Sequence, residues 1–116
     1  MKLREIFELI KNEFDEAITI NSIESINQNG LYLIFDGCQK QSAAKDTANF
    51  SLVIAANSLE ANNFTMLEEL EKLRRKLFVM AAAYGQSWYK DIKAAKFEGS
   101  TLYVYVIGFE VEIDAA

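Results

Sequence analysis

The stretch Thr101–Ile113, TLYVYVIGFEVEI, is the longest strand-like run in the chain, and we expect the rest of the fold to be organised around it. Its apolar residues recur with a period of two, which is the pattern of a β-strand. One face stays apolar to the end and consists of Tyr103, Tyr105, Ile107, Phe109, Val111 and Ile113. The other face is apolar at first and then acidic, with a bulge or bend expected at Gly108. This pattern predicts a strand that is buried on both faces where it starts and that opens to water or to a partner where it ends.

The composition describes one acidic globular domain without histidine. The chain has 116 residues, which corresponds to a single domain (residues 1–116), and 51% of them are apolar, enough for a hydrophobic core. The net charge of −5 argues against nucleic-acid binding, which needs a basic face. Histidine, the commonest general base and metal ligand, is absent, and the one cysteine, Cys38, cannot form an intrachain disulfide. The lone thiol, with no apolar run of about 20 residues, predicts a cytosolic protein that does not span a membrane.

Two segments have the apolar spacing of amphipathic helices. In Met1–Ala17 the apolar residues recur at intervals of four and three, so that one face packs on the core. Thr65–Tyr84 has a similar stripe, which begins behind the capping-box pair Thr65 and Glu68. Gly85 follows as a C-terminal cap.

The remaining apolar runs predict three further strands. They are Leu31–Phe35, Asn49–Asn57 and a short one at Ile92–Phe97. Ile18–Gln28 mixes two spacings and is interpreted as a short strand or an irregular connection. Cys38–Ala48 is polar and without periodicity, which predicts a loop, as does Ser58–Phe64. With the order α-β-β-α-β-β, we expect a single α+β domain with an antiparallel or mixed four-stranded sheet and both helices packed on one face.

Three acidic residues project from one face of the last strand near its end. They are Glu110, Glu112 and Asp114. Residues two apart on a strand are separated by about 7 Å, too far to share a cation without other ligands, so we predict no metal site. Two interpretations stay open, a solvated strand end and an electrostatic contact with a partner.

Four basic residues follow one another closely in the second helix and form what we call the basic collar. They are Lys72, Arg74, Arg75 and Lys76. The collar is either a solvated face, paired in part with acids one turn back, or a match for the acidic strand end of a neighbouring copy. A chain with one basic and one acidic patch can close into a head-to-tail ring.

No residue pattern in the sequence predicts catalysis. Cys38 and the serines have no histidine to activate them, and a phosphate-binding loop is not formed by the residues after Gly37. We therefore expect a protein that is not an enzyme and that carries no cofactor.

The order of the apolar runs resembles that of the phage tail-terminator family, which includes the Mu-like prophage tail proteins and minor tail protein U. The resemblance covers about residues 31–113. It is carried by LYLIFDG at Leu31–Gly37, FSLVIAANS at Phe50–Ser58, MLEELEKLRRKLF at Met66–Phe78 and LYVYVIGFEVE at Leu102–Glu112.

The resemblance implies an assembly function without catalysis. Members of the family act as hexameric rings that cap the growing tail tube, stop its polymerisation and offer a surface to the head. The expected partners are further copies of the chain, the tail-tube protein and the head-completion protein, in the bacterial cytoplasm during assembly and then in the virion tail. The loop Cys38–Ala48 would face the tube or its lumen. The candidate contact residues are Lys40, Lys45, Arg74, Arg75, Glu110, Glu112 and Asp114.

Two further interpretations remain open from the residues alone. One is a small adaptor or regulatory module that binds a peptide or a small ligand on its sheet. The other is an enzyme that works without histidine.

Overall fold

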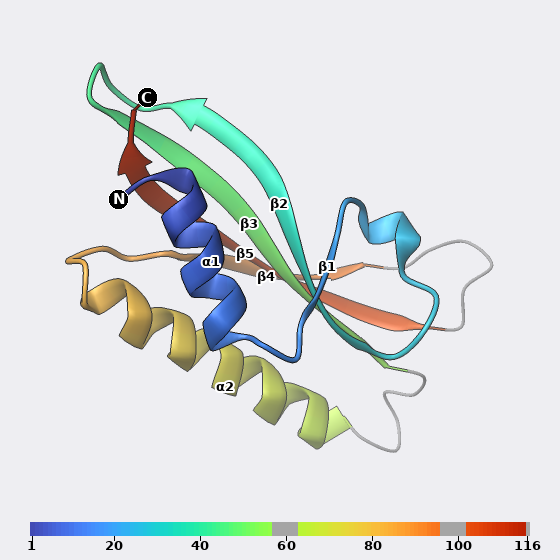
Figure 1. Ribbon diagram of the computed structural model, residues 1–116. Coiled ribbons are helices and arrows are strands. Elements are labelled where there is room, and N and C mark those ends of the chain that lie inside the picture. The colour runs from blue at the N-terminus through green and yellow to red at the C-terminus, as the bar shows by residue number, and fades with distance from the viewer. Residues whose placement is uncertain (57–62, 96–101, 116) are drawn as a thin grey trace.

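The computed structural model describes residues 1–56, 63–95 and 102–115, with the backbone alone for residues 63–65 (Figure 1). Within these ranges the helices are α1 (Leu3–Glu13) and α2 (Asn63–Ala82), with a short 3-10 helix at Ile23–Ser25. The strands are β1 (Ile18–Ile20), β2 (Gly30–Lys40), β3 (Lys45–Ala56), β4 (Tyr89–Ala95) and β5 (Tyr103–Asp114).

The five described strands form one mixed sheet in the order β1-β2-β3-β5-β4. β1 runs parallel to β2, and the other neighbours are antiparallel. The α+β class is confirmed, but the expected number of four strands and the expected element order were wrong. The additional strand is β1, which pairs with Tyr32–Ile34 of β2. It lies in Ile18–Gln28, the segment interpreted as either a short strand or an irregular connection. Three residues are too few to show a period of two, so a tertiary contact decides their conformation.

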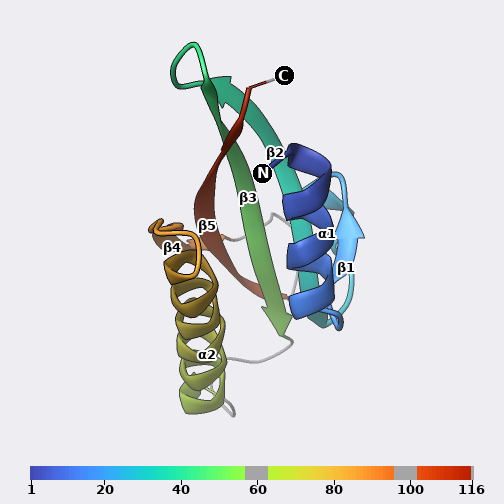
Figure 2. The same cartoon turned by 60° about the vertical axis from the view of Figure 1, so that its left-hand side comes forward.

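Both helices pack on the same face of the sheet and enclose the main core (Figures 1 and 2). From α1 the core receives Ile6, Ile10 and Phe14, and from α2 it receives Met66, Leu70, Leu73, Leu77 and Ala81. The sheet contributes inward residues of β2, β3 and β5, which include Leu33, Leu52, Ile107 and Val111. We call the side of the sheet that the helices cover the helix face, and the opposite side the open face.

An aromatic contact lies at the centre of the helix face. The rings of Phe50 on β3 and Phe109 on β5 are stacked, with centroids 5.3 Å apart. Phe35 on β2 and Phe7 on α1 lie against Phe50, at 5.4 Å and 6.2 Å. One side chain therefore joins three neighbouring strands and a helix.

The open face is covered at one end only. A second apolar cluster lies there, where Ile26 and the partly buried Ile20 and Ile23 pack with sheet residues. The sheet residues are Tyr32, Ile34, Val53, Ala55 and Val104, and Leu102, directly before β5, joins them. The first half of β5 is therefore apolar on both faces because this cluster covers its open side.

The expected loop Cys38–Ala48 is mostly strand, which corrects the sequence interpretation. β2 continues to Lys40 and β3 begins at Lys45, so that four residues remain in the turn. The chain passes Asp36-Gly37, expected to end the strand, through a register shift at which Gly37 has a φ of 121°. Polar residues stay extended here because β3 pairs with β5 over its whole length.

The end of α2 explains the approach of the chain to β4. Gly85 has a φ of 68°, and its N–H donates to Ala82 while that of Gln86 donates to Ala81. These two bonds form a Schellman motif and confirm the expected glycine cap. The start was misplaced, since α2 begins at Asn63 and Thr65 lies within its first turn. The described strand β4 starts at Tyr89, before the expected Ile92, and the expected end of that strand at Phe97 lies outside the described ranges.

We predict that Phe50→Ala destabilises the protein by about 3–5 kcal/mol, because it leaves a cavity where four elements meet. Phe35→Ala is the matched control, since Phe35 is 37% exposed and should cost about 1–2 kcal/mol. Urea unfolding followed by fluorescence of the buried Trp88 measures both values. Equal losses of stability in Phe50→Ala and Phe35→Ala would contradict a central role for Phe50 in the core.

Candidate functional site

The acidic residues of β5 lie on the open face, beyond the second apolar cluster. Their cross-strand neighbours on β3 are Asn49, Thr47 and Lys45. The strand itself does not leave the core at this end, contrary to expectation, because Val111 and Ile113 remain buried on the helix face. The N-terminal end of the chain lies beside it, where the Asp114 N–H donates to the Met1 carbonyl. The acids are therefore the polar side of a strand that is paired to its end.

Asp114 is held by two cations of the same chain. Its Oδ1 atom lies 2.6 Å from Lys45 Nζ, and its Oδ2 atom lies 2.5 Å from the amino group of Met1. The hydrogen bond from Lys45, then that from the amino group, lowers the pKa of Asp114 to about 2. Asp114 in turn raises the pKa of Lys45. Two of the expected contact residues thus pair with each other within one chain.

We predict that this pair stabilises the protein at neutral pH and not in strong acid. The unfolded-state pKa of an aspartate is about 3.9, whereas that of folded Asp114 is about 2. The contribution is therefore fully present above about pH 4 and is lost as the pH falls through about 2. Urea unfolding of the wild type and Asp114→Asn across this range should give free energies of unfolding that converge in acid.

Lys45→Met is the control background for this measurement. Without the Lys45 cation, the effect of Asp114→Asn should be smaller at neutral pH. An effect of the same size at every pH, in both backgrounds, would contradict the electrostatic explanation.

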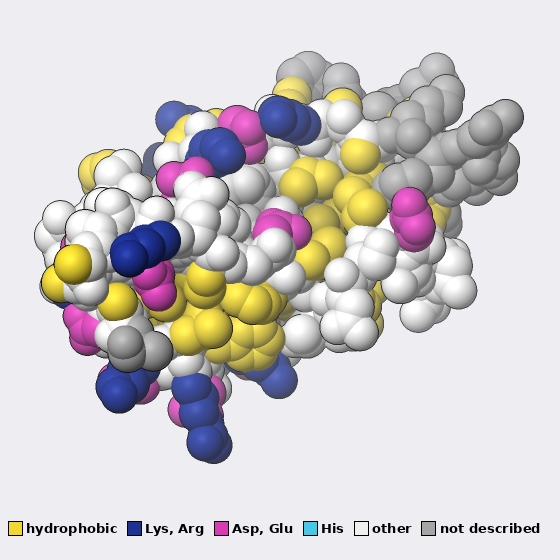
Figure 3. Space-filling view, turned by 90° about the horizontal axis from the view of Figure 1, so that it is seen from above, with side chains coloured by type: hydrophobic (Ala, Val, Ile, Leu, Met, Phe, Trp, Pro, Cys, Tyr) yellow, Lys and Arg dark blue, Asp and Glu magenta, His cyan; other side chains and the backbone are white. Residues whose placement is uncertain are grey.

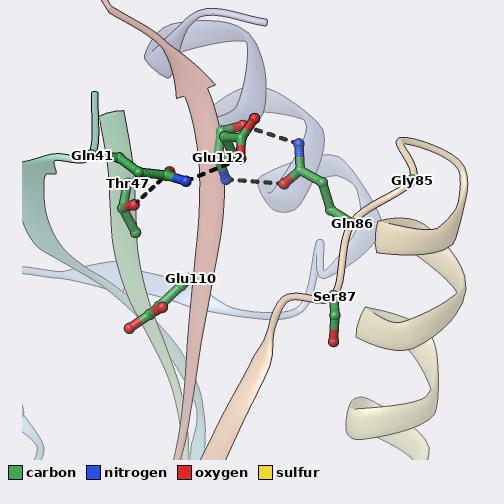
Figure 4. A pocket seen from close by; sticks show the side chains of 7 residues that line it. All are labelled: Gln41, Thr47, Gly85, Gln86, Ser87, Glu110 and Glu112. Atoms are coloured by element: carbon green, nitrogen blue, oxygen red, sulfur yellow. Dashed lines mark hydrogen bonds between the residues drawn. The ribbon is translucent and has the colours of Figure 1, made fainter. Parts of the chain in front are cut away.

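A polar pocket of about 290 Å³ opens beside Glu110 and Glu112, between the sheet and the connection from α2 to β4 (Figure 4). Its lining consists of Gln41, Thr47, Gly85, Gln86, Ser87, Glu110 and Glu112. Gln41 donates to the Glu112 carboxylate over 3.4 Å and accepts from the Thr47 hydroxyl over 3.1 Å. Glu110 pairs with Lys90 of β4 at 3.4 Å. The carboxylates at this pocket therefore already have partners in the chain.

Gln86 completes the outer edge of β5 with its side chain. Between β5 and the connection that leads to β4, a backbone hydrogen bond runs from the Glu110 N–H to the Trp88 carbonyl and is 2.8 Å long. At Glu112, two residues further along β5, the side-chain amide of Gln86 takes the place of a backbone partner. That amide accepts from the Glu112 N–H at 2.9 Å and donates to the Glu112 carbonyl at 3.2 Å (Figure 4). A paired backbone residue would make the same two bonds. The Trp88 indole N–H, which donates to Gln86 Oε1 over 2.8 Å, holds the amide in place.

We predict that Gln86→Ala destabilises the protein by about 1–3 kcal/mol, because it removes these bonds and leaves the indole N–H of buried Trp88 without its acceptor. Urea unfolding measures the loss, and amide hydrogen exchange at Glu112 should become faster. Ser87→Ala, in the same pocket, is the control and should stay within about 0.5 kcal/mol. Unchanged exchange at Glu112 in Gln86→Ala would show that the amide does not protect this edge.

The basic collar of α2 lies on the helix side of the sheet, opposite the acids. Arg74 pairs with Glu71 at 3.1 Å, and its guanidinium lies 4.9 Å from the ring centroid of Tyr89. Lys76 lies over the ring of Phe14. Arg75 makes no ion pair with any residue of the described ranges. The structure therefore does not bring the collar and the acids together within one chain.

The last candidate, Lys40, lies at the end of β2 and is exposed. Its neighbour across the ladder is Asp46. Lys40 and Lys45 thus flank the tip of the β2–β3 hairpin, which extends beyond the helices (Figure 1). This tip is the part of the expected loop that does remain a turn.

The described residues provide little for catalysis or metal binding. They contain no group of three or more His, Cys, Asp or Glu side chains that could hold a metal ion. Desolvation and then the charge of Asp46 raise the pKa of Cys38, which makes its thiol a poorer nucleophile. No helix among the described residues is long and apolar enough to cross a membrane.

Two features of the surface escaped the sequence interpretation. The amide of Gln86 gave no signal, because its role depends on a strand 26 residues away. Phe78 and Val79 are 67% and 63% exposed. The sequence could have predicted their exposure, since both residues fall outside the four-three stripe of α2.

The comparisons with known proteins give no family assignment: no protein-family model matches the chain, and no curated protein matches its sequence.

Proposed function

We propose that this chain is a structural assembly protein of the tail-terminator type, which associates with further copies of itself and caps a phage tail tube. The observation that carries the proposal is the placement of unlike charges on opposite sides of one small domain. Glu110 and Glu112 lie on the open face of β5, and Arg74 and Arg75 lie on α2 across the sheet. These groups are separated within one chain and can meet between two copies.

A contact between such surfaces is heterologous, because each copy offers a different patch to each of its two neighbours. Heterologous contacts close into a ring when the rotation between copies allows it, and the family resemblance favours a ring of six. Arg75 has no ionic partner among the described residues, so a neighbour's carboxylate would supply one. Asp114 is held by two cations, whereas Glu110 pairs with Lys90 alone at 3.4 Å and Glu112 has no cationic partner in the described ranges, which makes Glu110 and Glu112 the better candidates for the contact.

The projecting β2–β3 hairpin is the element that we assign to the tube. It extends beyond the helices, carries Lys40 next to its tip and has an exposed turn at residues 41–44 (Figure 1). Under the proposal the ring places this tip against the tail-tube protein and offers its other side to the head-completion protein. The chain would then act in the bacterial cytoplasm during assembly and stay in the virion tail.

We predict that paired charge reversals separate the two surfaces. Arg74→Glu/Arg75→Glu and Glu110→Lys/Glu112→Lys should each stay monomeric, because like charges then meet at the contact. An equimolar mixture should assemble again, since the two variants can alternate around a ring with every contact restored. Light scattering at low salt measures the mass of each sample, and wild-type assembly should weaken as salt is added.

The tube function has its own measurement. Tail-tube protein from the same genome, polymerised with the wild-type chain, should give shorter tubes by electron microscopy than with either variant alone. A monomeric wild-type chain that also leaves tube length unchanged would contradict the proposal. Variants that assemble as the wild type does would remove these residues from the contact.

A further inference from the structure

The strand β4 ends the sheet on the side of α2, and its outer edge has no partner among the described strands. Its seven residues, Tyr89–Ala95, pair with β5 on their inner side only. Backbone N–H and C=O groups on such an edge can accept a further strand from another chain.

One flank of α2 beside this edge carries exposed apolar side chains between charged ones. Leu67, Glu71, Arg74 and Phe78 recur at intervals of four, three and four, so they share one side of the helix. Leu67 is 51% and Phe78 is 67% exposed. Phe78 and Tyr89 line a cavity of about 270 Å³ at the point where the helix meets the strand. The cavity is large enough to admit one large apolar side chain.

The rim of this cavity is basic in a chain whose net charge is −5. Arg74 and Arg75 both line it, and only Glu71 among its lining residues is acidic. Arg74 is engaged with Glu71 and with the Tyr89 ring, whereas Arg75 makes no ion pair within the described ranges. On the strand itself, Lys90 and Lys93 are further cations, which pair with Glu110 and Asp91 at 3.4 Å each, so that a ligand would have to share them with these carboxylates. A ligand that fits this rim carries negative charge.

We propose that the β4 edge and the adjoining flank of α2 bind an extended acidic segment of a partner protein by strand addition. The backbone of the segment pairs with β4. Because its side chains alternate between the two faces, an apolar residue directed to the helix side enters the cavity between Phe78 and Tyr89. Acidic residues of the segment meet Arg75 on that side and Lys90 and Lys93 on the other. Specificity comes from the apolar anchor and the charges, while the backbone supplies the pairing.

This site shares Arg75 with the ring contact proposed above, so a copy of the chain and the partner segment would compete for that residue. Glu110 and Glu112 belong to the ring contact alone, and Phe78 belongs to the peptide site alone. Variants at these positions therefore distinguish failure of one proposal from failure of the other.

The probe is a fluorescein-labelled peptide of sequence EEVFVEE, titrated with the wild-type chain and followed by fluorescence anisotropy at low salt. In the extended peptide the second and sixth residues lie on the side of the phenylalanine, toward Arg75, and the terminal glutamates lie on the other side. Phe78→Ser and Arg75→Glu should each weaken binding about fivefold or more, through loss of the anchor and of the charge pair. Val79→Ser is the matched control, because Val79 is as exposed on the same helix but does not line the cavity. It should leave the affinity within about twofold.

Two further peptides separate strand addition from other modes of binding. A version with N-methyl groups on alternate amides cannot pair with an edge strand and should lose its affinity, and KKVFVKK should not bind. The amide hydrogens of β4 should exchange more slowly when EEVFVEE is bound.

Three results would overturn the proposal. They are no saturable binding of EEVFVEE to the wild type, equal losses in Phe78→Ser and Val79→Ser, and undiminished binding of the N-methylated peptide. If the peptide fails to bind while Phe78→Ser dissociates a wild-type oligomer, the flank belongs to a contact between copies and the partner segment is excluded.

Discussion

The ladder between β3 and β5 is the constraint on which the rest of this structure depends. Every residue of β3, from Lys45 opposite Asp114 to Ala56 opposite Tyr103, has a partner on β5. A shift of β3 by one residue against β5 would turn Phe50 to the open face, away from Phe109, and bring Ser51 into the core. The stacked rings of Phe50 and Phe109 therefore hold the register that places all the polar groups described above.

The register also determines what each end of the sheet displays. Near Ala55 and Val104 both faces are apolar, and residues from the segment after β1 cover the open one. Toward Lys45 and Asp114 the open face becomes polar while the helix face stays apolar through Ile113. A single pair of strands thus changes from a two-sided core to a surface along its length, without any break in the ladder.

The sequence was informative where burial alone decides the structure and misleading where pairing decides it. The alternation in Thr101–Ile113 and the stripe from Met66 to Leu77 predicted which side chains enter the core, because hydrophobic periodicity records burial directly. Cys38–Ala48 has no hydrophobic periodicity. Its second half, Lys45–Ala48, is extended because it pairs with β5, a strand more than sixty residues later, and Cys38–Lys40 then pair with it in the hairpin. No local pattern predicts this pairing.

The same distinction between local pattern and tertiary arrangement applies to the candidate surfaces. The charges of the collar and of the strand end could be read from the sequence, but their places on opposite faces could not, since these depend on which face α2 covers. The pairing of Asp114 with Lys45 is likewise a property of the ladder and not of either segment.

The cap of α2 connects the two surfaces. The left-handed Gly85 turns the chain toward the sheet, so that Gln86 reaches Glu112 and Trp88 becomes buried. Ser87, the residue between them, lines both the polar pocket at the acids and the apolar cavity at Phe78. Because the same turn fixes where β5 is closed by a side chain and where β4 begins, it determines how much edge remains open. An acidic face for copies of the chain and an open edge for another protein can therefore lie close together on one domain without competing for the same backbone groups.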